Sequence, residues 1–293
     1  MATDADGLRV LHLKLNTANA RYLADFYEKA LGFRFISREH LSGARREGIS
    51  PVSGRALRIT LALGAQTVEL DQFVDQPGRP YPEGSLASDL IFQHFAIVVA
   101  DMDDAMQRLS AVSGWTSITV DGPQHLPASS GGVVAFKFRD PDGHPLELLA
   151  FPPHDTPRQW RSSGAAGPFL GIDHTAISVT DSARSIAFYE ALGLAVSNRS
   201  LNDDVTQARL DHGEHPVVEV TAMAPDVATP HLELLCYRGE RDEAPLDLRA
   251  NDVAATCVVF GPVGERAPPI DGDAAPMCHL QDPDGHYLSI ESP

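Results

Sequence analysis

An internal repeat constrains this chain more than any other feature of its sequence. Three histidines recur in alternating apolar segments, 82 and 80 positions apart: His12, His94 and His174. Three glutamates recur in later apolar segments, 78 and 86 positions apart: Glu69, Glu147 and Glu233. Recurrence of this kind indicates a fold that is built by stacking one supersecondary unit.

The first unit has the pattern of a strand, a helix and further strands. Residues 9–15 alternate as a half-buried strand does, with His12 on the less apolar face. A helix should follow, because Asn19 is a good N-terminal cap and an apolar stripe repeats at helical spacing behind it. Two more strands are predicted over 56–63 and 67–73, and the second carries Glu69. The unit is therefore of the βαβββ type.

The later units repeat this pattern with decreasing completeness. The second has its helix after Asp101 or Asp103 and a turn, Asp-Pro-Asp-Gly-His, over 140–144. In the third, Phe-Tyr-Glu at 188–190 matches Phe-Tyr-Glu at 26–28 of the first. The fourth repeats the turn at 282–286, has no amphipathic helix pattern, and carries Ser289 where Glu147 is found in the second unit.

Two connectors rich in proline, glycine and serine, 75–88 and 152–168, separate the units. A length of 293 residues with 43% hydrophobic content is sufficient for two cores. We predict a first domain over 1–153, containing modules 8–74 and 91–151, and a linker over 154–170. A second domain over 171–293 would contain modules 171–238 and 251–293, of which the last is degenerate.

Composition limits the possible partners. A formal net charge of -17 opposes binding to nucleic acid and to anionic membrane surfaces, so a small molecule is the expected partner. The N-terminus has no apolar segment behind a basic start, which predicts a cytoplasmic protein. Four units in one chain need no partner to complete the fold, so a monomer or a homodimer is expected. The three cysteines lack metal-binding or disulfide spacing and are expected to be small buried hydrophobic residues.

The four units together resemble the vicinal oxygen chelate superfamily, which includes glyoxalase I, bleomycin resistance proteins and extradiol dioxygenases. The resemblance rests on the opening Asp173-His174, the Phe-Tyr-Glu helices and the two Asp-Pro-Asp-Gly-His turns. It implies an α+β fold of four tandem βαβββ modules. These would pair into two cupped, incomplete β-barrels with the helices outside and the fourth module truncated.

The resemblance also implies a metal inside a cup, held by the first-strand histidine and the last-strand glutamate of two paired modules. If neighbours pair, the ligands are His12, Glu69, His94 and Glu147, and Glu147 and Glu69 are the catalytic residues. If the second module pairs with the third, the ligands are His94, Glu147, His174 and Glu233. The long connector over 152–168 favours neighbour pairing. Imidazole and carboxylate ligands suit Zn, Ni, Co, Mn or Fe(II).

Each of these residues also has a simpler interpretation. A single histidine in a strand is more often a hydrogen-bonded core residue than a ligand, so recurrence in register is what favours His94 with Glu147. His144 and His286, in the turns, are expected to be exposed and not to bind metal. Lys14 is expected to extend its ammonium group into solvent.

Three functions fit these features. The first is a metal-dependent lyase or isomerase of the glyoxalase or epimerase type, which transfers a proton on a small substrate chelated through vicinal oxygens. The second is an extradiol ring-cleaving dioxygenase, although Lys137 and His279 occupy the positions where that family's signature has tyrosine. The third is a non-catalytic protein that binds a small molecule or an antibiotic, as in drug resistance.

Overall fold

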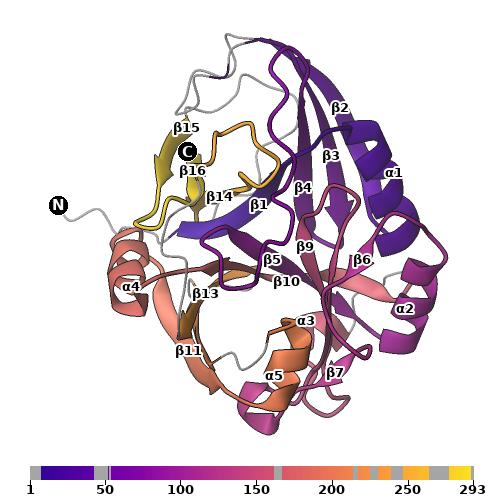
Figure 1. Ribbon diagram of the computed structural model, residues 1–293, viewed down its shortest axis with the longest axis vertical. Helices are drawn as coiled ribbons and strands as arrows, with labels where there is room; N and C mark the ends of the chain where they lie inside the picture. The colour runs from indigo at the N-terminus through magenta and orange to yellow at the C-terminus, as the bar shows by residue number, and fades with distance from the viewer. Residues whose placement is uncertain are drawn as a thin grey trace.

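The computed structural model describes residues 8–42, 52, 54–161, 167–213, 217–224, 230–238, 247–263 and 277–291. Two curved sheets lie one above the other in Figure 1, with α1 and α2 along one side and α4 on the opposite side. The predicted α+β fold of tandem modules is confirmed, and the described strands form open sheets and no closed barrel.

The first module comprises β1 (Leu8–Asn16), α1 (Ala20–Leu31), β2 (Arg34–Leu41), β3 (Ala56–Leu63) and β4 (Gln66–Phe73). The Asn19 side chain accepts a hydrogen bond from the Tyr22 backbone N–H at the start of α1, as predicted. Gly32 ends the helix in the left-handed region, with φ of 71°. Sequence reasoning missed β2, because most of its side chains are exposed or half-buried and show no alternation.

The second module comprises β5 (Phe92–Val99), α2 (Met102–Ser110), β6 (Thr116–Ser117), β7 (Gln124–His125), β8 (Val134–Arg139) and β9 (Pro145–Ala150). A short helix, α3 (Arg158–Arg161), follows in the connector. The third comprises β10 (Phe169–Ser178), α4 (Ser182–Ala191), β11 (Ala195–Asn202), α5 (Val205–Leu210), β12 (Val217–Ala224) and β13 (His231–Arg238). The fourth has β14 (Cys257–Pro262), β15 (Met277–Gln281) and β16 (Tyr287–Glu291), with no helix among its described residues.

The strand order corrects the predicted pairing of modules. One sheet has the order β15-β16-β14-β1-β4-β3-β2 and joins the fourth module to the first. The other contains β11-β12-β13-β10-β5-β9-β8-β6 and joins the third module to the second. The pairing of neighbours within 1–153 and within 171–293 is therefore wrong, and the alternative pairing is the observed one.

The connector over 152–168 was misleading because its length does not keep the second and third modules apart. Strand β10 begins directly after this connector and runs antiparallel to β5, with Phe169 opposite Val99. The two strands are neighbours in the middle of the nine-stranded sheet. Neighbouring modules instead pack through helices α1 and α2 and through the turns. Both parts of the chain, 1–153 and 171–293, contribute strands to both sheets. Their division into two domains stays a prediction.

The first aspartate and the histidine of each Asp-Pro-Asp-Gly-His turn are buried, so the prediction of exposed His144 and His286 is wrong. In the first turn Asp140 accepts hydrogen bonds from the Tyr27 hydroxyl at 3.0 Å and from the His144 backbone N–H at 3.0 Å. His144 Nε2 lies 3.0 Å from the Asn16 carbonyl oxygen, at the end of β1. Each histidine is therefore a buried link between its turn and the preceding module.

The second turn repeats these contacts on the third module. The Tyr189 hydroxyl donates to Asp282 at 3.1 Å, and His286 Nε2 lies 2.7 Å from the Ser178 carbonyl oxygen. Thr17 and Thr180 donate to the second aspartate of their turns, Asp142 and Asp284 respectively. The turns thus hold module two on module one and module four on module three.

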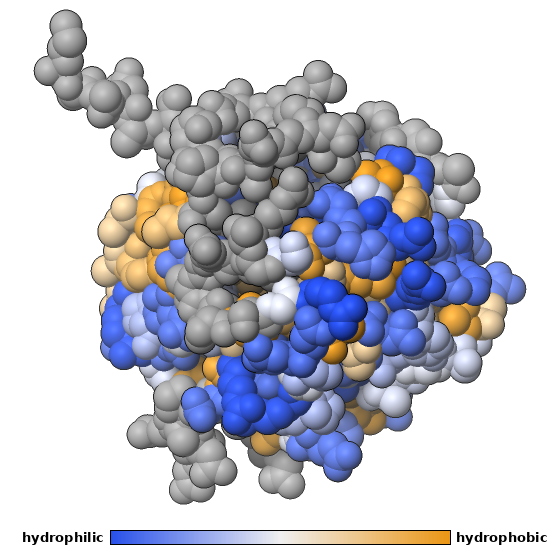
Figure 2. Space-filling model, turned by 90° about the horizontal axis from the view of Figure 1, so that it is seen from above, coloured by the Kyte–Doolittle hydropathy of each residue, from blue (hydrophilic) through white to orange (hydrophobic). Residues whose placement is uncertain are grey.

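The surface and the cysteines add two further observations. The described surface in Figure 2 is mostly hydrophilic, and the exposed large apolar side chains, such as Leu86 and Val205, come from separate elements. No helix in the described part of the chain is long and apolar enough to span a membrane. Cys278 is exposed and Cys236 and Cys257 are half-buried, so the prediction that the cysteines are buried hydrophobic residues is wrong.

We expect Tyr27→Phe to lower the free energy of unfolding by about 1–3 kcal/mol, because a buried carboxylate loses a hydrogen bond. Chemical denaturation at neutral pH measures this change. Tyr22→Phe, on the same helix but half-exposed, is the matched control and should change the free energy by no more than about 0.5 kcal/mol. Equal effects of the two substitutions would contradict a structural role for the buried turn.

Candidate metal centre

The register of four adjacent strands gathers the candidate ligands on one face of the nine-stranded sheet. In the β5–β10 pair, His94 is opposite Ala176, and in the parallel β10–β13 pair, Ala176 is opposite Glu233. In the parallel β5–β9 pair, Ala96 is opposite Glu147. The cup formed by modules two and three therefore contains His94, Glu147, His174 and Glu233.

The side chains of this set converge. His94 Nε2 lies 2.8 Å from Glu147 Oε2, and His174 Nε2 lies 3.7 Å from the same oxygen. Glu233 Oε2 lies 3.6 Å from His174 Nε2. His94, Glu147 and His174 are all buried, and their ligand atoms lie within 4.8 Å of one another, as ligands around one ion must. Glu233 is at the edge of this group.

The donor atoms of the two histidines fit a metal better than they fit a structural role. His94 Nε2 and His174 Nε2 are buried and both face Glu147 Oε2, but neither has the geometry of a hydrogen bond to it or to another described residue. A buried polar atom without a hydrogen bond is costly, and two imidazole nitrogens facing one carboxylate form a set that a divalent cation satisfies. The residues present therefore fit the metal that the sequence implied.

A second layer of residues orients His174. Its Nδ1 lies 3.1 Å from Asp173 Oδ2, and the Trp160 indole N–H donates to Asp173 Oδ1 at 3.2 Å. The register of β10 against β5 shifts between Ile172 and His174, and a shift of this kind changes the local direction of the strand at Asp173. With Nδ1 bonded to a carboxylate, Nε2 is left with the lone pair that a metal needs.

Gly171 makes room for this arrangement. A Cβ atom there would lie 2.7 Å from Trp160 Cζ3 and 2.6 Å from Gln66 Oε1. Gln66 Oε1 itself accepts a hydrogen bond from the Ile172 backbone N–H at 3.1 Å. The connector that sequence reasoning treated as a linker therefore contributes Trp160 to the support of the candidate ligand.

The four ionisable groups have strongly shifted pKa values. Burial would raise the pKa of Glu147, but His94, His174 and Lys137 hold it well below the usual value. Burial likewise opposes charge on Glu233, yet His174 and His231 lower its pKa to about 2. Burial and Lys137 lower the pKa of His94, whereas Glu233 and Asp173 overcome burial and raise that of His174. Both carboxylates are therefore charged at neutral pH, and His174 holds a proton more tightly than an ordinary histidine until a metal displaces that proton from Nε2.

The four candidate ligands, His94, Glu147, His174 and Glu233, line a cavity of about 350 Å³. Apolar side chains from both modules form much of its wall, including Leu126, Leu149, Leu210, Val218 and Leu235. Asparagine, glutamine and serine side chains from β11, α5 and 129–130 also line it. An apolar cavity with a few convergent polar groups is the usual form of a small-molecule site.

Helix α5 closes one side of this cavity through a buried ionic network. The Lys137 ammonium donates to Asp211 Oδ1 at 2.6 Å. Asp211 Oδ2 accepts from the Tyr237 hydroxyl at 2.8 Å and from Gln207 Nε2 at 2.6 Å. Lys137 is also the register partner of Glu147 in the β8–β9 pair, so it brings a buried positive charge close to the four candidate ligands. Figure 1 shows α5 between β11 and β7 in the lower part of the view.

The structure places His12 and Glu69 in the other cup, apart from His94 and Glu147. His12 Nε2 lies 3.5 Å from Glu69 Oε2, but Arg58 Nη1 lies only 2.9 Å from the same oxygen. Lys14 is buried, with its ammonium 3.9 Å from Glu69, so the prediction that it extends into solvent is wrong. Two cations thus already neutralise Glu69.

The fourth module completes that cup, but it has Ser289 at the position equivalent to Glu147 and an alanine, Ala254 or Ala255, where the first-strand histidine is expected. Ser289 is bonded to His279 Nδ1 at 2.6 Å and lies 3.2 Å from Cys257 Sγ. The set of His12, Glu69, His94 and Glu147 is therefore not brought together, whereas the alternative set is. Sequence reasoning missed the supporting residues Asp173 and His231, although Asp173 directly precedes a predicted ligand.

Comparison with known proteins agrees with this architecture. The model of the Glyoxalase/Bleomycin resistance protein/Dioxygenase superfamily matches residues 9–148 and 171–290. The virulence protein STM3117 of Salmonella typhimurium is 29% identical over 147 residues, which are 49% of this chain and 84% of that protein.

Two solved structures are similar over almost the whole chain. Glyoxalase I from Zea mays is 18% identical, with a TM-score of 0.61 over 97% of this chain and 92% of that one. A proposed dioxygenase from Bacillus subtilis is 13% identical, with a TM-score of 0.59 over 98% of this chain and 86% of that one. At such identities the likeness shows the fold alone.

We expect His174→Ala to reduce the affinity for Ni²⁺ or Zn²⁺ by at least about 100-fold, because one of three clustered donors is lost. Elemental analysis after dialysis, together with calorimetric titration, measures the bound metal. His12→Ala, the equivalent change in the other cup, should leave the stoichiometry at the wild-type value. Loss of metal in His12→Ala but not in His174→Ala would contradict this site and place the metal in the cup of the first and fourth modules.

We also expect metal affinity to rise with pH. The pKa of His174 is raised above 6.5, so at acidic pH a proton must leave its Nε2 before metal binds. Affinity should fall by about tenfold for each pH unit below that pKa. Titrations at pH 6 and pH 7 measure the slope. Asp173→Asn removes a carboxylate that raises the pKa, so the slope in this variant should be smaller.

Proposed function

The chain belongs to the Glyoxalase/Bleomycin resistance protein/Dioxygenase superfamily, and we propose that it is a divalent-metal-dependent enzyme of the glyoxalase or epimerase type. Its substrate would be a small molecule that binds the metal through vicinal oxygens and undergoes proton transfer. A metal-dependent lyase or isomerase is the reaction class that this proposal implies.

One observation carries the proposal. Two imidazole nitrogens without hydrogen-bond partners and the carboxylate of Glu147 meet at the base of an apolar cavity, and a second carboxylate, Glu233, lies 3.6 Å from His174. Three donors are enough to hold an ion with coordination positions left open for a substrate. The second carboxylate is then available for chemistry.

The residues divide into holding and proton-transferring roles. His94, His174 and Glu147 would hold the ion, which supplies Lewis-acid polarisation of a substrate carbonyl when bound. Glu233 would accept the proton from the carbon next to that carbonyl and return it to a neighbouring position. At neutral pH its carboxylate is deprotonated and so able to accept a proton, and His231 Nε2, 3.4 Å away, orients the carboxylate. Lys137 would favour negative charge that develops on the substrate.

This assignment replaces Glu69 by Glu233 as the second carboxylate of the reaction. Glu69 is in the other sheet and is ion-paired with Arg58 at 2.9 Å. Glu147 contacts both histidines and is better suited to hold the ion than to move a proton. The full set in one cup is the one that pairing of the second and third modules implied.

A ring-cleaving dioxygenase is the second candidate, and one observation favours it. Two histidines and one carboxylate are the ligand set of non-haem Fe(II) oxygenases, and His94, His174 and Glu147 form such a set. Against it, the family's tyrosine position is occupied by Lys137, whose ammonium is bonded to Asp211. Lys137 has no phenolic hydroxyl to offer a substrate.

A binding protein without catalysis is the third candidate, since the same cavity is large enough to hold an antibiotic-sized ring. For all three candidates we propose a small-molecule partner and a cytoplasmic protein that acts as a monomer or homodimer. The net charge of -17 supports the exclusion of nucleic acid and of anionic membrane surfaces as partners.

We expect Ni²⁺- or Co²⁺-loaded protein in D₂O to exchange the carbon-bound protons next to the carbonyl of small α-hydroxyketones such as hydroxyacetone. Proton NMR measures the exchange. Glu233→Gln should slow it by at least about 100-fold, because general-base catalysis contributes a factor of that order. The bound metal should remain, since His94, Glu147 and His174 are unchanged.

Glu69→Gln is the matched control, a glutamate at the equivalent strand position of the other cup, and should exchange at the wild-type rate. Oxygen uptake with catechols by Fe(II)-loaded protein, without any proton exchange, would instead establish the dioxygenase. Protein that binds no divalent metal after purification without chelator would exclude both enzymes.

A further inference from the structure

The two Asp-Pro-Asp-Gly-His turns make equivalent contacts, but the space beside them is used differently. Beside the first turn lies the phenol ring of Tyr81, which is buried, with 7% of its surface exposed. Its ring centroid is 6.0 Å from that of His144, edge to face, and 5.3 Å from the Arg139 guanidinium carbon. The first turn therefore cradles an aromatic ring.

Glycine in the turn allows this close approach. A Cβ atom at Gly143 would lie 2.9 Å from the Tyr81 Cβ. At the equivalent position of the second turn, a Cβ atom at Gly285 would have no described atom within 4 Å. The residue before each turn makes the same contact with the turn, although its type differs. Arg139 donates to the Gly143 carbonyl at 2.9 Å, and Gln281 donates to the Gly285 carbonyl at 3.2 Å.

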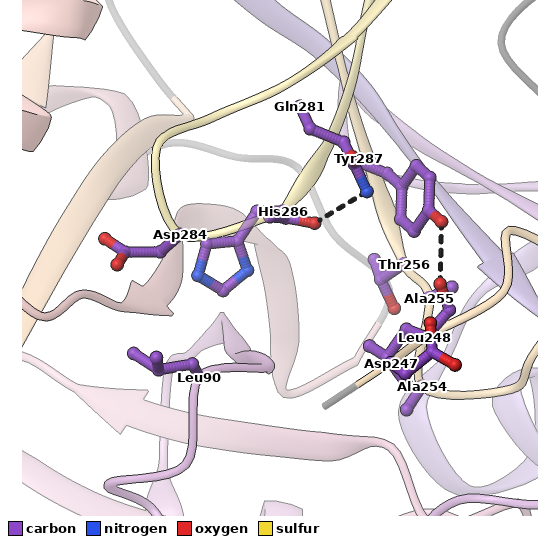
Figure 3. A pocket seen from close by; sticks show the side chains of 11 residues that line it. Leu90, Asp247, Leu248, Ala254, Ala255, Thr256, Gln281, Asp284, His286 and Tyr287 are labelled. Carbon is purple, nitrogen blue, oxygen red and sulfur yellow. Dashed lines mark hydrogen bonds between the residues drawn. The ribbon is translucent and has the colours of Figure 1, made fainter. Parts of the chain in front are cut away.

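The space beside the second turn is a cavity of about 430 Å³. Figure 3 shows its border: the His286 ring and Asp284 from the turn, Tyr287 from β16, Leu90 just before β5, and Leu248 between β13 and β14. No aromatic side chain of the described part of the chain contacts His286 in the way that Tyr81 contacts His144. The cavity is separate from the metal centre and shares no lining residue with it.

One buried polar group in this cavity lacks a partner. Thr256 is 4% exposed, lines the cavity, and its Oγ1 makes no hydrogen bond with a described residue. A buried hydroxyl without a partner costs free energy, which a ligand with a hydrogen-bonding group would recover. The other polar groups nearby are engaged: the Tyr287 hydroxyl donates to the Leu248 carbonyl and Asp284 accepts from Thr180 and Arg184.

We propose that this cavity is a second ligand site, which takes a neutral or cationic aromatic ring carrying a hydroxyl group in the position that Tyr81 occupies beside the first turn. The ring would lie against His286 and Leu90, and its hydroxyl would bond to Thr256. The exposed Asp247 and the glutamine that replaces Arg139 make the site unsuited to anionic rings. The inference does not depend on the reaction proposed for the metal centre.

The probe for this site is 4-fluorophenol, with binding followed by ¹⁹F NMR line broadening on the full chain. We expect saturable binding at one site, and stronger binding of tyramine than of 4-hydroxyphenylacetate in competition. Thr256→Val keeps the side-chain shape and should weaken binding about tenfold, because one buried hydrogen bond is lost. His94→Ala should bind as the wild type does.

Two variants test the comparison between the turns. Gln281 is exposed, and Gln281→Arg restores the cation found beside Tyr81, so it should strengthen phenol binding about two- to fivefold and permit binding of 4-hydroxyphenylacetate. Tyr81→Ala opens the first cradle and should raise the stoichiometry from one phenol to two. Absence of saturable binding, or weaker binding in His94→Ala with no change in Thr256→Val and Gln281→Arg, would overturn the proposal.

Discussion

The candidate metal site depends on the antiparallel pairing of β5 with β10. This pairing joins the second module to the third and sets His94 and His174 in neighbouring strands, with ring centroids 5.5 Å apart. Glu147 and Glu233 follow from the parallel strands on either side of that pair. Had neighbouring modules shared a sheet, His94 would lie beside His12, and the Asp173–Trp160 support of His174 would have no ligand to orient.

Much of the fold could be predicted because it depends on local signals that repeat. Alternation marked β1, β5 and β10, and Asn19 marked the start of α1. The pairing of modules could not be predicted in this way, because each module offers two similar sheet edges and the connector length does not select between them. The decisive contacts, such as Phe169 opposite Val99, have no signature in either strand alone.

The candidate site shows the same limit. The repeat identified all four residues of the cup, but equally identified His12 and Glu69, whose environment differs through Arg58 and Lys14 on neighbouring strand positions. The contacts of Lys137 with Asp211 and of Trp160 with Asp173 form only in the folded chain. His144 and His286 were wrongly predicted to be exposed, because a glycine-containing turn normally lies at the surface. These two turns instead pack on the preceding module through their histidines.

The order of modules in the two sheets has a consequence for synthesis of the chain. All strands of the nine-stranded sheet precede β14 in the chain, so this sheet with its candidate metal site can assemble while later residues are still being made. Strand β1 waits for β14, with Val10 opposite Phe260, and until then one of its edges lacks a partner. Nascent chains are therefore most exposed to misassembly at this edge, after the chemically important cup has formed.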